Sequence, residues 1–327
     1  MLNFCTLYYA NYSAKGVVLY RSLEKVCKDF HLFIVAMDEA CLNILQDMSL
    51  LHVTVISIAE LEEFYPALKH VKGDRNKGEY SWTCKGPTLL YCHDKYQLEE
   101  CTYLDADLYF FSNPTPLYEE CPGADVMLMD HGYTPWYDLA ETNGKYCAGY
   151  MYFKYTDNGL KVLKEWTEQC IEWCYSRHEP GRFGDQKYLD EFHQKYENVY
   201  DLQYLGLCAP WNIQQYDVTQ GDNGYVYVSK NGQNAKLIMY HFHFLNNQDF
   251  GKYNEFYLGP YNLNGGVKDI IYKPYLEQLK RFTKYVDSLS TQIDVLASKG
   301  QRMSDFSYLW HWCKNVWKSN KIQWRRI

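Results

Sequence analysis

Two carboxylates one residue apart, Asp105 and Asp107, stand between two apolar and aromatic runs. Such flanks are typical of a buried strand, and residues i and i+2 of a strand point to the same face. We therefore expect both acids to leave the end of a strand on one side. Neighbouring carboxylates repel unless one is protonated or a cation lies between them. The spacing predicts half of a Mg²⁺ or Mn²⁺ site, with phosphate oxygens as further ligands.

The same acids have two other interpretations. They fit a strand end followed by a turn, with the carboxylates accepting hydrogen bonds from backbone N–H groups. They also fit the nucleophile pair of one class of phosphatases, but such enzymes need Thr or Val two residues after the second acid, where this chain has Tyr109. The apolar strand that runs directly into the acids favours the metal site.

The composition narrows the class of protein. The chain has 327 residues, 47% of them hydrophobic, which is enough for a large core in one or two domains. Its net charge of −7 argues against a nucleic-acid partner. Aromatic residues reach 17%, and their flat faces with polar tips suit sugars and bases. The 12 Cys form no Cys-x-x-Cys pair and no run of about 18 apolar residues occurs, so we expect a cytoplasmic location.

Apolar periodicity predicts alternating strands and helices in the first third of the chain. Strands are expected at 2–9, 31–37, 52–58 and in the run before Asp105, with helices at 13–28, 40–48 and 86–98. This order predicts an α/β fold with a mostly parallel sheet flanked by helices. Ligands bind beyond the carboxyl ends of such strands, where the two acids lie. Further strands are expected at 124–129, 148–154 and 236–244, and helices at 160–174 and 274–297.

Several segments in a fixed order carry a family resemblance. They are Thr6 with Tyr12, Arg75 with residues 79–83, residues 103–111, Phe183-Gly184-Asp185-Gln186, Ala209-Pro210-Trp211-Asn212 and Tyr240-His241-Phe242-His243. In these segments the chain resembles the GT-A nucleotide-diphospho-sugar glycosyltransferases. Among them it resembles the retaining, galactosyltransferase-like (glycosyltransferase family 8-like) bacterial transferases of polysaccharide and lipopolysaccharide synthesis. The resemblance covers about residues 1–250.

The resemblance implies a domain organisation. The expected GT-A, Rossmann-like catalytic domain spans 1–255, with a nucleotide-binding half at about 1–112 and an acceptor and sugar half at about 113–255. Residues 256–327 are then a C-terminal helical, basic and aromatic extension.

The resemblance also implies that Asp105, Asp107 and a distal His hold Mn²⁺ or Mg²⁺, which binds the donor's diphosphate. His241 and His243 are both candidates, since they share one face of the expected late strand. Imidazole beside carboxylates suits Mn²⁺ better than Mg²⁺, which prefers oxygen. We expect one of the two histidines to be the ligand and the other to be a hydrogen-bonded core residue. Its place in the motif favours His241 as the ligand.

Further donor contacts are implied at scattered positions. Thr6 is expected to hydrogen-bond the nucleoside, and Tyr8 or Tyr12 to stack on its base, with a core role as the alternative for Tyr8. Arg75 is expected to contact the diphosphate with its positive charge. Lys85 is a second candidate for this role, but we favour the alternative that it is a solvated residue on the surface. The expected donor contacts are Thr6, Tyr8, Tyr12, Arg75, Asp105, Ala106 and Asp130.

Two catalytic residues follow from the same resemblance. Asp185 is expected to accept hydrogen bonds from the donor sugar, with a helix N-cap as an additional or alternative role. Gln186 is expected beside the anomeric carbon. Because Gln is a poor nucleophile, we expect same-face attack in which the departing phosphate oxygen takes the acceptor's proton. Relatives usually carry Asn where this chain has Cys147, which leaves the donor sugar open.

The predicted function is metal-dependent, retaining transfer of a sugar from a nucleotide-diphosphate donor, with UDP favoured, to a glycan or lipid-linked acceptor. A nucleotidyltransferase on a related fold is one alternative, but residues 10–16 lack the Gly-rich, basic loop it needs. A non-catalytic sugar-binding module is another. Residues 306–327 combine Trp with Lys and Arg, which predicts peripheral contact with the inner membrane face; a helix packed on the catalytic domain is the alternative.

Overall fold

The computed structural model describes residues 1–249 and 254–289. Its centre is a seven-stranded sheet with the order β3-β2-β1-β4-β7-β6-β8. These strands run parallel except β7, which is antiparallel to its neighbours β4 and β6. The expected α/β fold with a mostly parallel sheet is confirmed. The bounds are β1 Leu2–Tyr8, β2 Phe30–Ala36, β3 Val53–Ser57, β4 Glu100–Leu104, β6 Val126–Asp130, β7 Tyr146–Lys154 and β8 Val199–Asp201.

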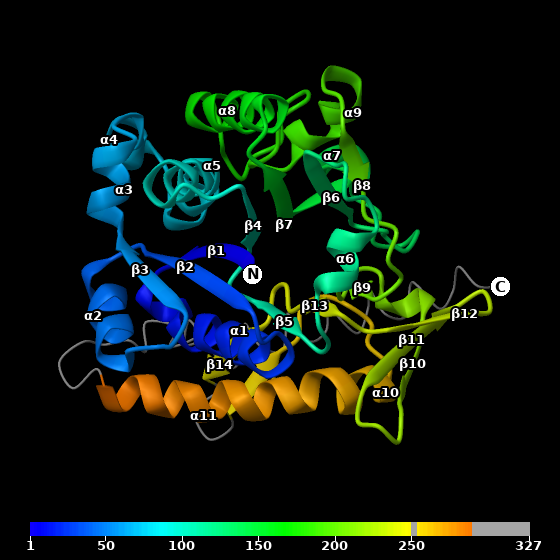
Figure 1. Ribbon diagram of the computed structural model, residues 1–327. Helices are drawn as coiled ribbons and strands as arrows, with labels where there is room; N and C mark the ends of the chain where they lie inside the picture. Colours follow the sequence, from blue (N-terminus) through cyan, green and yellow to red (C-terminus); the bar gives the residue numbers. More distant parts are fainter. Residues whose placement is uncertain (250–253, 290–327) are drawn as a thin grey trace.

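Helices cover both faces of this sheet (Figure 1). On one face, α5 (Lys77–Tyr96) and α8 (Asp157–Glu172) pack on a core that includes Leu89 and Trp166. On the other face, α1 (Ser13–Val26) and α2 (Glu39–Met48) bury Leu23 and Ile44, and α11 (Lys273–Leu289) lies alongside α1. The shorter helices are α3 Ile58–Phe64, α4 Ala67–Val71, α6 Thr115–Glu119, α7 Ala140–Asn143, α9 Phe192–Lys195 and α10 Gly265–Val267.

Helix α5 begins at Lys77 rather than at residue 86 as expected. Asn76 provides a capping box: its side chain accepts hydrogen bonds from Gly78 N and Glu79 N, and the Glu79 carboxylate accepts one from Asn76 N. The helix continues through Pro87 in its interior. The earlier start matters because it places Lys85 within the helix, on the side that faces the sheet.

The chain leaves the main sheet at the two acids. β4 ends at Leu104, a turn follows in which Leu108 N donates to Asp105 O (3.1 Å), and β5 (Leu108–Phe110) joins a different sheet. The prediction that both acids extend from one face of a single strand is therefore wrong, because Asp107 lies in the turn. The backbone of the structural alternative, a strand end followed by a turn, is the one observed.

The second sheet has the order β5-β13-β9. The late strand expected over 236–244 is shorter: β13 is Met239–His241, and it runs antiparallel to β5 and parallel to β9 (Leu207–Cys208). Two small sheets complete the described strands. They are β10 Asp217–Gln220 with β11 Val226–Lys230 and β12 Gln233–Lys236, and β14 Asn246–Asp249 with β15 Asn254–Tyr257.

The C-terminal expectations are met in part by described residues. The helix expected over 274–297 is observed as α11, which is described from Lys273 to Leu289. The rest of that expected range and the segment 306–327 lie outside the described residues. The domain boundary at residue 255 stays a prediction. Within 1–249 and 254–289, no helix combines the length and apolarity needed to cross a bilayer.

Asp125 joins three segments just before β6. Its carboxylate accepts hydrogen bonds from Thr156 Oγ1 (2.7 Å), Asn158 Nδ2 (2.8 Å) and Asn198 Nδ2 (3.0 Å), and the residue is buried. Burial alone would raise the pKa of this carboxyl, but the three hydrogen bonds lower it. Since Thr156 caps α8, the carboxylate connects that helix to the sheet.

We expect Asp125→Ala to lower the free energy of unfolding at pH 7 by about 2–3 kcal/mol, because buried donors lose an ionised acceptor. The stabilisation is fully present above the unfolded-state pKa of about 3.9 and is lost as pH falls through the lowered folded-state pKa. Urea unfolding should therefore show the gap to wild type narrowing below about pH 4. The exposed Asp47→Ala serves as control, and a pH-independent gap would contradict the assignment.

Candidate functional site

Strand pairing brings His241 to the two acids. Leu108 of β5 is paired with His241 of β13, and Phe242 N donates to Asp107 O (2.9 Å). His241 Nε2 then lies 3.1 Å from Asp107 Oδ1 and 3.9 Å from Asp105 Oδ2. One ligand atom of each residue lies within 4.8 Å of the others, so the three residues form a group that could hold a metal ion.

His241 and Asp107 shift each other's pKa values. Burial disfavours the imidazolium of His241, but the neighbouring Asp107 outweighs it and raises the pKa of His241 well above its usual value. Burial would raise the pKa of the Asp107 carboxyl, but His241 and, to a smaller extent, Lys15 lower it. The acids therefore attract positive charge, which a proton on His241 or a divalent cation can supply. Two carboxylates and one imidazole are a donor set that suits Mn²⁺.

Lys85 is a buried bridge between two acids. Its Nζ lies 3.1 Å from Asp105 Oδ1 and 2.9 Å from Asp185 Oδ2, and it donates to Ala148 O (3.0 Å). The side chain is 3% exposed, so the favoured expectation of a solvated surface charge is wrong. Burial would lower the pKa of this amine, but Asp105 and Asp185 outweigh burial and raise it. The bridge ties α5 to the turn that carries the acids.

Asp185 is held from two sides. Its carboxylate pairs with Lys85, and its carbonyl oxygen accepts a hydrogen bond from Trp166 Nε1 (2.8 Å) on α8. It does not cap a helix, because the residue before the following 3₁₀ turn is Gln186, whose side chain makes no cap. The N-cap expected of Asp185 is therefore wrong. Burial raises the pKa of this carboxyl, against the effect of Lys85.

A pocket of about 430 Å³ opens beside the acids and His241. Aromatic side chains form much of its wall, and Lys77 and Lys85 contribute positive charge. Lys77 Nζ lies 4.8 Å from the centre of the Tyr9 ring, and Lys15 Nζ lies 4.4 Å from that of Tyr12. The aromatic residues of the wall are Tyr8, Tyr9, Tyr12, Trp82, Tyr103 and Phe244, and Ala106 and His243 also line it.

The two histidines have different surroundings. His241 belongs to the group with the acids, whereas the Nδ1 of His243 lies 3.0 Å from the Tyr261 hydroxyl. Burial and the charge of His241 lower the pKa of His243 to about 3, so it is neutral. In the described residues, His243 does not join the group that could hold the ion. The assignment of His241, and not His243, as a metal ligand stays a prediction.

Four other predicted residues lie away from the pocket. Thr6 is fully buried in β1. The Arg75 guanidinium donates to Cys170 O, Ile171 O and Thr83 Oγ1, so it joins α5 to α8 instead of facing a diphosphate. Asp130 accepts from Gly132 N and pairs with Lys145, and Gln186 Nε2 donates to Asn143 O (2.8 Å). Within the described part of the chain, none of these four lines the pocket.

Two further residues lie close to the acids. Lys15 on α1 lies 3.9 Å from Asp107 Oδ2 and donates to Leu245 O (2.8 Å), yet its position looks like that of any helical lysine. Gly149 on β7 accepts from Asp105 N through its carbonyl (2.8 Å). A Cβ on Gly149 would lie 2.8 Å from His241 Cε1 and 2.9 Å from Asp105 Oδ2. Cys147, two residues earlier on β7, also contacts His241, with Sγ 3.6 Å from its Nδ1.

We expect Gly149→Ala to fold but to bind Mn²⁺ about 10–100-fold more weakly, because the new methyl group displaces His241 and Asp105 from each other. Isothermal titration with Mn²⁺ measures the affinity, and thermal unfolding without metal reports on the fold. Gly123→Ala is the control, since its Cβ would meet no atom within 4 Å. Equal affinities of the two variants would contradict the contact.

We expect Lys85→Met to cost about 3–5 kcal/mol of unfolding free energy, because Asp185 is left charged and buried without its partner. Adding Asp185→Asn to Lys85→Met should recover part of this loss, since the unpaired charge is then removed. Urea unfolding of the single and double variants forms a complete cycle with Asp185→Asn. Additive losses in this cycle would show that the two residues do not interact.

Known proteins with similar sequences cover most of the chain. It is 29% identical over 291 residues to YfnD of Bacillus subtilis (strain 168), and this match covers 88% of this chain and 91% of YfnD. It is 32% identical over 249 residues to YfnF of the same organism, and that match covers 73% of this chain and 80% of YfnF. Both are described as uncharacterized proteins. A crystal structure of the galactosyltransferase LgtC with donor and acceptor sugar analogs matches the fold with a TM-score of 0.50 and 15% identity, covering 91% of this chain and 100% of LgtC.

The profile of a family described as Nucleotide-diphospho-sugar transferase matches residues 100–276, which is more than half of the chain. The matched segment contains Asp105, Asp107, Asp185 and His241, which meet in the geometry above. The chain therefore belongs to the nucleotide-diphospho-sugar transferase family and is an enzyme of that family with a GT-A fold.

Proposed function

We propose that the protein transfers a sugar, with retention of configuration, from a nucleotide-diphosphate donor to a glycan or lipid-linked acceptor. The observation that carries the proposal is the convergence of Asp105, Asp107 and His241 beside a pocket with aromatic walls. A UDP-linked donor is proposed from the resemblance to galactosyltransferase-like enzymes. The lipid-linked acceptor rests on the sequence of 306–327, which lies outside the described residues.

The residues present fit a divalent cation. Their oxygen and nitrogen donors lie within one ion's reach, and Gly149 leaves the space beside His241 and Asp105 free of a side chain. We propose Asp105, Asp107 and His241 as its ligands and Mn²⁺ as the ion. When bound, such an ion neutralises the charge that builds on the diphosphate leaving group.

The pocket supplies the contacts proposed for the nucleotide. Tyr9, Tyr12 and Trp82 offer ring faces for a base or a sugar, and Tyr8 contributes to the wall from β1. Lys77 lies on the first turn of α5, where the helix dipole adds positive charge. Lys77 and Lys85 supply positive charge and the aromatic rings supply flat faces, which together match a ligand with a phosphate end and a flat, polar end.

We assign the proposed sugar contacts to the segment held by Lys85. Lys85 holds the Asp185 carboxylate and the Asp105 carboxylate on one ammonium group. Asp185 itself does not line the pocket, and we propose it as the acceptor for a hydroxyl of a sugar that reaches beyond the pocket. Gln186 follows it in the chain and stays the candidate beside the anomeric carbon. The proposed step breaks the bond from the anomeric carbon to phosphate oxygen and forms one to the acceptor oxygen, whose proton passes to the departing phosphate.

Asp107→Ala tests the metal and donor proposal together. We expect wild type to be stabilised by UDP-sugars only when Mn²⁺ is present, by about 2.7 kcal/mol at a hundredfold excess over Kd, and to lose this shift with EDTA. The variant should show no such shift and no UDP release. A thermal-shift panel of UDP-glucose, UDP-galactose and GDP-mannose, followed by a UDP-release assay, makes the measurement.

The exposed Asp222→Ala controls for loss of a carboxylate elsewhere and should behave as wild type. A metal-independent shift in wild type, or an unchanged shift in Asp107→Ala, would contradict the assignment of the ligands.

A further inference from the structure

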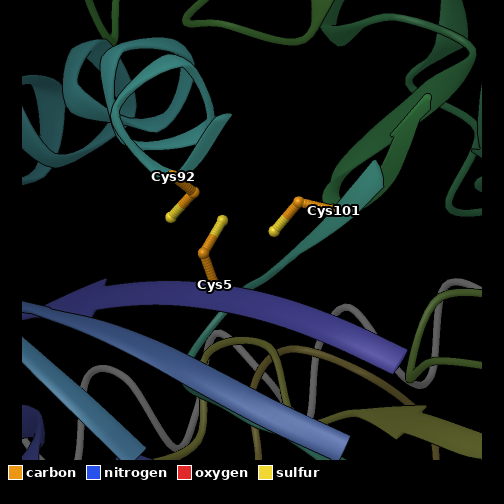
Figure 2. A group of neighbouring side chains, drawn as sticks. All are labelled: Cys5, Cys92 and Cys101. Atoms are coloured by element: carbon orange, nitrogen blue, oxygen red, sulfur yellow. The ribbon is translucent and has the colours of Figure 1, made fainter. Parts of the chain in front are cut away.

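Three cysteines from three elements lie close together between α5 and the main sheet (Figure 2). Cys5 lies on β1, Cys92 near the end of α5 and Cys101 on β4, and their side chains point toward one another. Their Sγ atoms all lie within 4.8 Å of one another. All three residues are buried, with exposed fractions of 0%, 0% and 1%.

We propose that Cys5, Cys92 and Cys101 bind one thiophilic cation, Cu⁺ in the first place, as a structural site separate from the diphosphate site. A cation about 2.3 Å from each of three sulfurs holds those sulfurs about 4 Å apart in a trigonal plane. The three sulfurs lie no more than 4.8 Å apart, so side-chain rotations can complete the geometry. Soft thiolates select cations such as Cu⁺ and Zn²⁺ over Mn²⁺ and Mg²⁺.

The number of ligands favours Cu⁺. In the described residues, no fourth Cys, His, Asp or Glu joins the group, whereas structural zinc sites are almost always closed with four ligands. Binding replaces up to three S–H protons, which pass to the buffer, by metal–sulfur bonds and changes no oxidation state. Burial would raise the pKa of the Cys101 thiol, but its interactions with Cys5, Cys92 and Tyr155 outweigh burial and lower it.

The position explains what such an ion would do. The same three elements carry residues of the diphosphate site: β1 ends at Tyr8, α5 carries Lys85, and β4 leads into Asp105. The ion would fasten these elements to one another within the core that includes Phe33, Leu89 and Phe153. Because the thiols are buried, the ion must enter while the chain folds or opens locally.

The test uses the full chain from cells grown with added copper or zinc, purified anaerobically with excess reduced glutathione to remove weakly held ions. We expect one equivalent of Cu⁺ per chain and, by X-ray absorption, a shell of three sulfurs. This shell separates the site from Asp105, Asp107 and His241, which give oxygen and nitrogen scatterers. Cys92→Ala should lose the equivalent of metal and the associated rise in Tm.

Cys84→Ala is the matched control, since Cys84 is also fully buried on α5 but lies outside the group, and it should retain the metal. If Cys92→Ala fails to fold, Cys5→Ser replaces it. A three-sulfur shell with zinc instead of copper also supports the site. Wild type that retains neither metal, or a Cys92→Ala chain that retains as much as wild type, would overturn the proposal.

Discussion

Charge compensation among three carboxylates governs the site. Asp105, Asp107 and Asp185 are little exposed, and each has a basic side chain as its neighbour. Lys85 lies near two of them, at 3.1 Å and 2.9 Å, and His241 lies 3.1 Å from the third. Loss of one cation from such a cluster leaves an uncompensated buried charge, which costs more than the pair contributes. A diphosphate would add further negative charge, which a cation bound between the acids would offset.

The antiparallel strand in an otherwise parallel sheet completes the cluster. β7 lies between β4 and β6, and there its backbone passes directly behind the acids. Gly149 accepts a hydrogen bond from Asp105 N and leaves room for His241, while Cys147 touches the same imidazole. A parallel strand in that place would require a crossover connection and would present its residues in another order. The one antiparallel strand of this sheet therefore sets the space around His241 and Asp105.

Local sequence patterns predicted much of the fold correctly. The strands at the start of the chain and the helices α1, α2 and α8 follow apolar periodicities that depend on neighbours within a few residues. Errors came where a local pattern was interrupted. The helix α5 was predicted to begin at Gly86-Pro87, but it begins at Lys77, after the Asn76 capping box. The apolar residues on both sides of Asp105 were predicted to form one strand, but they belong to two strands in different sheets.

The sequence by itself determined the chemical types available: a pair of acids after a strand, a pair of histidines after another, and the alternation that makes an α/β sheet. Only the tertiary structure decided which of these meet. The register of β5 against β13 places His241 beside the acids, whereas His243 contacts the hydroxyl of Tyr261. The packing of α5 buries Lys85 between two carboxylates, and Arg75 donates hydrogen bonds to α8. The physical reason is that these contacts join residues far apart in the chain, whose pairing is set by burial of whole strands and helices and not by the residues next to them.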